Sequence, residues 1–243
     1  MPLLYLYRAL RERFIEDLTV IETLFFEEIY PVFANIEEEA QAIAKKTLND
    51  VMRSYPPDAD DLDPDMEEAI MEIFEGRCEL LSLMRYRTLA MWIMCLCQAW
   101  EQQLIKFVVI ETKNDGLFDT RDDRAVYGPA DLRKGFCFVK RVFSDHGVDF
   151  ESLESWQKIS ELRHLVNTLK HAEGSSAHEL RKLRPDYFDW DGRTSPNGLD
   201  SLELFGSTLL DETLKIKPQD FRDYRAALEI FWNELPENMK YCG

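Results

Sequence analysis

The chain has few of the residues from which metal sites and nucleophilic sites are usually built. It contains only 4 histidines and 5 cysteines among 243 residues. The cysteines form no C-x-x-C pair and match none of the spacings of a structural zinc site. We therefore expect buried free thiols in a reducing compartment, with no metal and no cofactor. The cysteines lie at positions 78, 95, 97, 137 and 242.

Long apolar runs are also missing. The most apolar stretch, Thr88 to Trp100, has thirteen residues, which is too short to cross a bilayer as a helix. The start of the chain, Met1 to Phe14, meets charges after a few apolar residues and has no small-residue cleavage site. We expect a buried core helix at residues 88–100 and a cytoplasmic protein with no membrane contact.

An excess of positive charge is absent as well. The formal net charge is −17, which disfavours general adhesion to nucleic acid or to anionic membranes, so any contact with RNA has to be local. The chain is 45% hydrophobic and 12% aromatic, which is enough to build a core. Its length suits one large domain or two small ones.

Helical periodicity is abundant. Apolar residues recur at steps of three and four over most of the chain, which predicts an all-α, multi-helix bundle. We expect a single domain over residues 1–243, made of an N-terminal helical arm (1–54) and a bundle (66–243). Short apolar runs near residues 200–217 could pair as a small β-hairpin insertion. The expected helices span residues 10–30, 31–53, 66–74, 78–112, 129–146, 153–173, 176–184 and 219–235.

An acidic segment separates the second and third of these helices. It reads SYPPDADDLDPD, residues 54–65, and superficially resembles a calcium-binding loop. It lacks the central glycine and the glutamate at the twelfth position that such a loop requires. We interpret it as a solvated linker.

Residues 158–184 form a basic island in this acidic chain. They carry six Lys or Arg against three Glu, a net charge of +3, which leaves −20 for the rest of the chain. A local excess of this kind could attract a phosphate, or it could pair with an acidic surface of the protein itself or of a partner. Three of the four histidines, at positions 164, 171 and 178, also lie here.

The expected helix 153–173 separates this island into two faces. Leu162, Leu165, Val166 and Leu169 share an arc of about 100°, which is the core face. Gly174 ends this helix, so His178 belongs to the next one. The adjoining polar strip consists of Arg163, His164, Asn167, Lys170 and His171.

This assortment suits cleavage of a phosphodiester without a metal. A histidine with a pKa near ~6.5 can exchange protons at neutral pH, and an arginine can hold two phosphate oxygens. The imidazole would take the 2′-hydroxyl proton of RNA while the cations stabilise the charge that develops on the phosphate. The alternative interpretation is the ordinary solvated face of a helix.

An Arg, an Asn and a His on a late helix of an all-α domain resemble the HEPN superfamily, whose hallmark is Arg, four to six residues, then His. Here seven residues separate Arg163 from His171. Either these two form the pair with one extra residue, or NTLKH, residues 167–171, is the working half and Lys170 supplies the cation. The resemblance implies a metal-independent ribonuclease of a toxin–antitoxin or anti-phage system, with its site at a homodimer interface.

The same resemblance implies roles for individual residues. His171 would be the general acid or base and Arg163 the phosphate clamp, with Asn167 in support. Lys170 and His164 would contact the RNA phosphates, as would Arg181 and Lys182 on the following helix. Two acidic residues have more than one possible role. Glu161 could orient a cation from the edge of the core. Glu101 is either a further site residue or a charge on a solvent-facing helix end.

Two other functions fit the sequence. One is a non-catalytic helical adaptor that dimerises or binds a partner protein, which its acidity and its long N-terminal helices favour. The other is a bundle that binds a small molecule or a nucleotide through the same basic strip.

Overall fold

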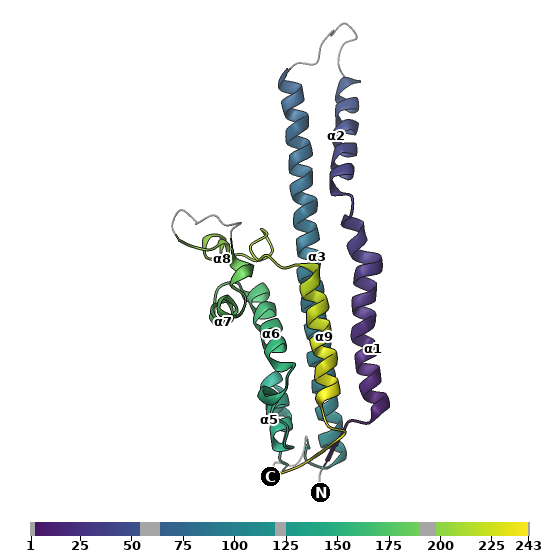
Figure 1. Cartoon of the computed structure of the whole chain (residues 1–243), viewed down its shortest axis with the longest axis vertical. Coiled ribbons are helices and arrows are strands. Elements are labelled where there is room, and N and C mark those ends of the chain that lie inside the picture. Colours follow the sequence, from purple (N-terminus) through teal and green to yellow (C-terminus); the bar gives the residue numbers. More distant parts are fainter. Residues whose placement is uncertain (1–2, 54–63, 120–124, 190–197, 243) are drawn as a thin grey trace.

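Four long helices run alternately up and down and form the body of the molecule (Figure 1). They are α1 (Arg8–Leu24), α3 (Pro64–Asn114), α6 (Trp156–His171) and α9 (Pro218–Glu234). The prediction of an all-α bundle is therefore confirmed. The computed structural model describes residues 3–53, 64–119, 125–189 and 198–242.

Short elements connect and flank these helices. Two of them, η1 and η2, continue α1 as a π turn and a 3-10 turn around Pro31, where the sequence predicts a break. The remaining elements are β1 (Leu3–Tyr5), η1 (Phe25–Ile29), η2 (Tyr30–Phe33), α2 (Ile36–Met52), α4 (Pro129–Leu132), α5 (Phe136–Asp145), η3 (Phe150–Ser152), α7 (Ser175–Leu183), η4 (Pro185–Phe188), α8 (Ser201–Phe205) and β2 (Asn238–Lys240).

The lower half of α3 packs most of its circumference against the core because it is apolar on all but one side, and the remaining face, which includes Gln98, Gln102 and Lys106, is exposed. Trp100 is fully buried and packs its ring against Phe136 of α5 and Phe231 of α9. Part of α3 is also long and apolar enough to meet a membrane-span test, with a mean hydropathy of 1.3 over eighteen residues. A core helix of a soluble protein meets the same test, so this result does not place the chain in a membrane.

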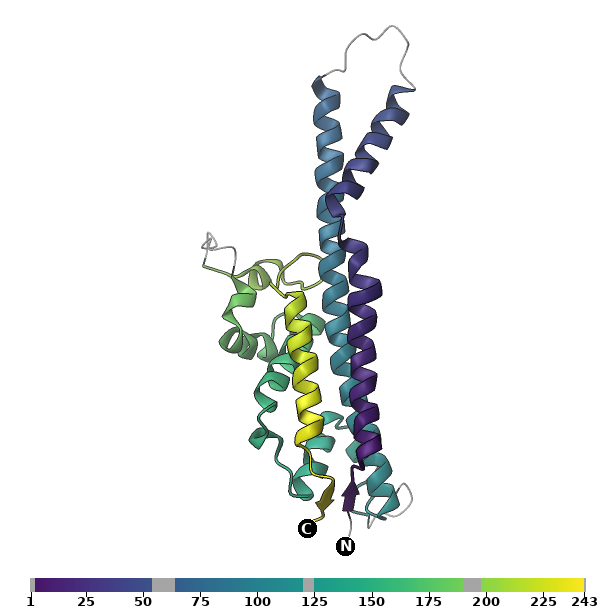
Figure 2. The same ribbon diagram turned by 45° about the vertical axis from the view of Figure 1, so that its right-hand side comes forward.

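The two helices of the expected N-terminal arm, residues 1–54, lie in different parts of the molecule. Helix α1 lies in the body, where the ring of Phe14 packs at a tilt against Trp232 of α9 with ring centroids 4.6 Å apart. Helix α2 instead projects beyond the body together with the first half of α3 (Figure 2). This happens because α3 is one uninterrupted helix through Gly76, so it carries its partner α2 away from the core.

A small antiparallel sheet is present, but its strands come from the two ends of the chain. β1 pairs with β2 in the register Leu3 to Lys240, Leu4 to Met239 and Tyr5 to Asn238. The sequence places a hairpin near residues 200–217 instead, and there the structure has the short helix α8 followed by non-strand backbone. The alternation in that stretch is imperfect, and Asp200 caps α8 through a reciprocal hydrogen bond pair with Glu203.

Two predicted helices are shorter than their apolar patterns suggest. The helix expected over 129–146 is interrupted at Gly135, whose φ of 55° only a glycine adopts readily. The helix expected to run to Glu173 ends at His171, because Ala172 takes a φ of 56°. The acidic linker at residues 54–65 lies almost entirely outside the described residues.

Candidate functional site

Arg163, the expected phosphate clamp, is held by two neighbours in the body. Its Nε donates to Glu101 of α3 at 2.9 Å, and its guanidinium lies 3.7 Å from the ring centre of Phe136. Glu101 is thus a salt-bridge partner at the α3–α6 contact and not a charge that merely faces solvent. These contacts fix the orientation of the guanidinium and leave its Nη groups without a hydrogen bond to any described residue.

Most of the other cations of the basic island are also held by carboxylates. Arg181 pairs with Asp200 at 2.5 Å and with Glu173, and its guanidinium lies over the ring of Phe188. Lys182 is exposed and pairs with Glu179 at 2.8 Å. The phosphate roles expected of Arg181 and Lys182 therefore compete with these carboxylates, since both side chains already form ion pairs, and neither residue is included in the site described below.

Arg184 and Glu161 form the centre of a buried polar network. One Glu161 oxygen accepts hydrogen bonds from Lys158, Arg184 and Tyr224, at 3.0, 2.9 and 2.8 Å. Arg184 also contacts Asp220 at 3.0 Å, so the network joins α6, α9 and the segment after α7. Burial raises the pKa of the Tyr224 hydroxyl well above its usual value. Glu161 does orient a cation, as the sequence suggests, but in a structural cluster.

Three polar side chains at the C-terminal end of α6 are left without partners. Asn167, Lys170 and His171 make no hydrogen bond and no ion pair with the residues that the structure describes, and Lys170 and His171 are exposed. Asn167 lies one turn from His171 and three residues from Lys170, so the three side chains are neighbours on the helix surface. Arg163 lies about 12 Å from His171 along the helix axis, two turns away.

His164 completes this strip on the side that faces α7. It is half-buried, and its Nδ1 has no partner among the described residues. Burial is the main reason that the pKa of His164 lies below its usual value; Arg163 lowers it further and Glu179 opposes the shift. The imidazole of His164 is therefore neutral at pH 7. We call Asn167, Lys170, His171 and His164 the free strip.

One thiol that feels the charges of Arg163 and Lys170 is unreactive at neutral pH. Cys97 of α3 is buried, and burial together with the charge of Glu101 raises its pKa to about 12, against the opposing effect of Arg163 and Lys170. A thiol with that pKa is protonated at neutral pH and is a poor nucleophile. Within the described ranges, no group of three or more His, Cys, Asp or Glu side chains could hold a metal ion.

The sequence predicts the polar strip of α6. It does not predict that Arg163 is held by an ion pair while the free strip has no partner among the described residues. All five polar residues lie on the face expected for them, because the leucines of α6 fix that face toward the core. The sequence does not indicate the role of Phe136, which supports Arg163, since an aromatic residue in an apolar helix gives no signal of a cation contact. No family model, no curated protein and no solved structure matches this chain.

Proposed function

We propose that this chain is a HEPN-like, metal-independent endoribonuclease that acts at the C-terminal end of α6, in the cytoplasm, as in toxin–antitoxin or anti-phage systems. One observation supports the proposal. Of the cations of the basic island, Lys170 alone has no carboxylate partner among the described residues, and it lies beside His171 and Asn167, which are also unpaired. An exposed cation next to a proton-exchanging group is what phosphodiester cleavage requires.

The chemistry assigned to the free strip follows from these groups. His171 takes the proton of a 2′-hydroxyl as that oxygen attacks the adjacent phosphorus. The bond from phosphorus to the 5′ oxygen breaks, the 5′ oxygen takes a proton from solvent water as it leaves, and a cyclic phosphate remains. Lys170 stabilises the negative charge on the phosphate oxygens, and Asn167 orients the phosphate or the imidazole. Arg163, held by Glu101, offers its Nη groups two turns away to a neighbouring phosphate.

The test is cleavage of single-stranded RNA by the purified protein in the presence of EDTA. His171→Ala should reduce the rate by about 100-fold or more, the range usual for loss of a general base. His178→Ala is the matched control, because His178 is also exposed but lies in α7 outside the free strip. A parent protein that cuts no RNA in EDTA contradicts the proposal, as does a His171→Ala variant that cuts at the parental rate.

Substitution of two lysines tests whether one particular cation or general positive charge promotes cleavage. Lys170→Ala should slow cleavage, whereas Lys182→Ala should leave it unchanged, because Lys182 is already paired with Glu179. Equal effects of the two substitutions would mean that general positive charge, and not the free strip, promotes cleavage.

We also propose that the site is completed by a second copy of the chain. The free strip is a helix surface, and a reaction of this kind benefits from a second wall that excludes water. Two α6 helices related by a two-fold axis would bring two copies of His171 and Lys170 together. Light scattering at micromolar concentration should report twice the mass of one chain, and a monomer that still cuts RNA would contradict the shared site.

The adaptor function is the alternative that we retain. It is favoured by exposed apolar side chains on one face of α3, where Leu80, Met84 and Met91 are 57%, 45% and 58% exposed. An adaptor with no activity would assemble with a partner protein but would cut no RNA, so the cleavage assay separates the two functions.

A further inference from the structure

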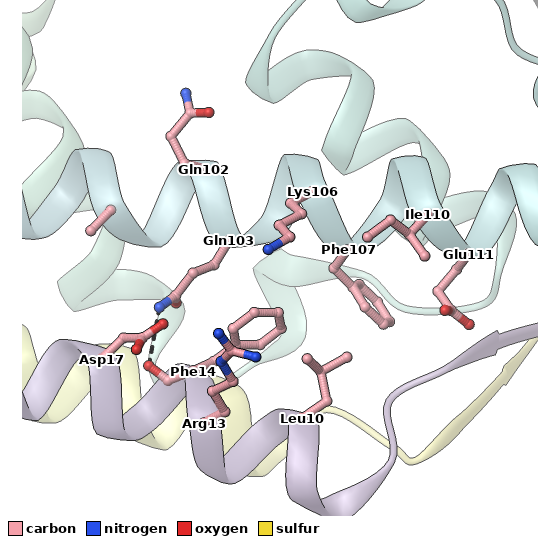
Figure 3. A pocket seen from close by; sticks show the side chains of 11 residues that line it. Leu10, Arg13, Phe14, Asp17, Gln102, Gln103, Lys106, Phe107, Ile110 and Glu111 are labelled. Carbon is pink, nitrogen blue, oxygen red and sulfur yellow. Dashed lines mark hydrogen bonds between the residues drawn. The ribbon is translucent and has the colours of Figure 1, made fainter.

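A groove between α1 and α3 lies apart from the residues of the proposed ribonuclease site. It has a volume of about 280 Å³ and is open along the two helices (Figure 3). It forms because α1 packs more closely on α9 than on α3, and because Ala99 is small at one end of the facing surface. The lining side chains that carry the argument are Arg13, Phe14, Asp17, Gln103, Lys106 and Phe107.

Gln103 points from α3 toward α1 and has an unused acceptor. Its side chain is 8% exposed, and its Nε2 donates to the carbonyl of Phe14 at 3.1 Å. Its Oε1 is buried and has no partner among the described residues. Buried amide oxygens in folded proteins almost always accept a hydrogen bond, so a ligand that offers an N–H or O–H group would meet a prepared position.

Two cations reach into the same groove from opposite sides. Figure 3 shows Arg13 of α1 and Lys106 of α3 extending into the space between the helices. Neither forms an ion pair with a described residue, although the chain carries a net charge of −17. Asp17 is an unpaired anion at the end near Gln103, and Glu111 accepts the backbone N–H of Tyr5 at 3.0 Å. The two cations are suited to bind an acidic group of a ligand. Gln103 and Asp17 are suited to accept hydrogen bonds from a donor group of the same ligand.

The walls between these polar groups are aromatic. Phe14 and Phe107 are buried at 5% and 2% exposure, and each presents part of its ring to the groove. Ligand sites for drug-sized molecules usually have about 300–1,000 Å³, so a groove of 280 Å³ fits a single ring better than a nucleotide.

We propose that the groove between α1 and α3 binds a small aromatic carboxylate that carries a hydroxyl or amino group at the far end of its ring. The carboxylate lies between Arg13 and Lys106, the ring lies against Phe14 and Phe107, and the hydroxyl or amino group donates to Oε1 of Gln103. Where the donor is an amino group, the carboxylate of Asp17 accepts a hydrogen bond from its second N–H.

The probe is 4-hydroxyphenylacetate, compared with phenylacetate, in calorimetric titrations of the full chain. The hydroxylated compound should bind saturably with a Kd below about 1 mM, and phenylacetate about tenfold more weakly, since it leaves Gln103 without a partner. Absence of saturable binding of 4-hydroxyphenylacetate overturns the proposal, and so does equal affinity for the two compounds.

Substitution of the two cations tests whether they contact the carboxylate of the probe. Lys106→Ala should weaken binding of the probe about three- to fivefold, as expected for an exposed ion pair, and Arg13→Ala should do the same. Lys46→Ala on the projecting helix α2 is the matched control and should have no effect. Unchanged affinity in both Lys106→Ala and Arg13→Ala would overturn the assignment of the acidic group.

Gln103→Leu tests the buried acceptor. It should abolish the tenfold preference for the hydroxyl group while leaving the affinity for phenylacetate similar. Because this substitution also removes the hydrogen bond to Phe14, its fold is checked by circular dichroism. If the variant does not fold, the comparison of the two compounds on the parent protein and the two cation variants still decide the proposal.

Discussion

Ala172 sets the end of α6, directly after His171. Its φ of 56° and ψ of −128° belong to a conformation that glycine adopts readily and alanine does not. Among the residues that the structure describes, it is the only non-glycine with a positive φ. Such strain costs about 1–3 kcal/mol and persists only where the surrounding structure imposes it. Here the hydrogen bond from the Thr208 hydroxyl to the carbonyl of Leu169, at 2.7 Å, fixes the preceding turn.

The strain predicts that Ala172→Gly stabilises the protein. The substitution removes the cost of the positive φ and adds a smaller entropic cost in the unfolded chain, so the free energy of unfolding should rise by about 1 kcal/mol. Urea denaturation measures the change. Ala226→Gly, on an exposed position inside α9, is the matched control and should lower the stability by about 1 kcal/mol. A destabilised Ala172→Gly variant would show that Ala172 is not strained.

At the scale of elements, the buried network around Arg184 ties three segments together. Arg184 has a side chain that is 18% exposed and lies between Glu161 and Asp220, whose side chains are 9% and 8% exposed. Burying three charges has a large desolvation cost, which their mutual contacts and the hydroxyls of Tyr187 and Tyr224 offset. The network therefore fixes how α6, α7 and α9 meet, and the free strip depends on that arrangement.

Removal of the central cation should be costly. Arg184→Met leaves two buried carboxylates without their common partner, and we expect a loss of about 3 kcal/mol in the free energy of unfolding. Lys182→Met, at the exposed pair with Glu179, should change it by less than about 0.5 kcal/mol. Urea titrations of both variants measure the difference, and equal stabilities would mean that the network contributes no more than a surface pair.

The elements themselves could largely be predicted, because each long helix carries its own apolar periodicity. The ion pairs between these helices could not be predicted. Glu101 and Arg163 are 62 positions apart, and Arg184 and Asp220 are 36 apart, so no local pattern connects them. The sequence therefore predicts a basic island, whereas the tertiary structure neutralises most of it and leaves Lys170. The strands β1 and β2 have three residues each, too few for alternation to mark them, and they pair across nearly the whole chain.

For the whole molecule, charge limits where RNA can bind. The net charge of −17 repels a polyanion over most of the surface, and the unpaired cation of the proposed site is Lys170. If two copies contribute one Lys170 and one Arg163 each, the logarithm of the RNA affinity should fall against the logarithm of salt concentration with a slope of about −2.8. A general RNA-binding surface with eight phosphate contacts would give about −5.6.

Binding titrations at several salt concentrations, using the inactive His171→Ala variant, measure this slope. Lys170→Ala in the same background should reduce the slope to about −1.4, the value for the two Arg163 contacts that remain, and Lys182→Ala should leave the slope unchanged. A steep slope that survives Lys170→Ala would place the RNA elsewhere on the protein.

The small sheet that joins the two ends of the chain has a practical consequence. β1 and β2 lie side by side at one pole of the body, and the C-terminal end of α6 points toward the other (Figure 1). A short peptide could therefore link residue 241 to residue 3 without crossing the body, and new chain ends could be opened elsewhere. Such a circularly permuted chain would keep every helix contact described above. Labels attached at either end of the unpermuted chain would emerge together, well away from His171.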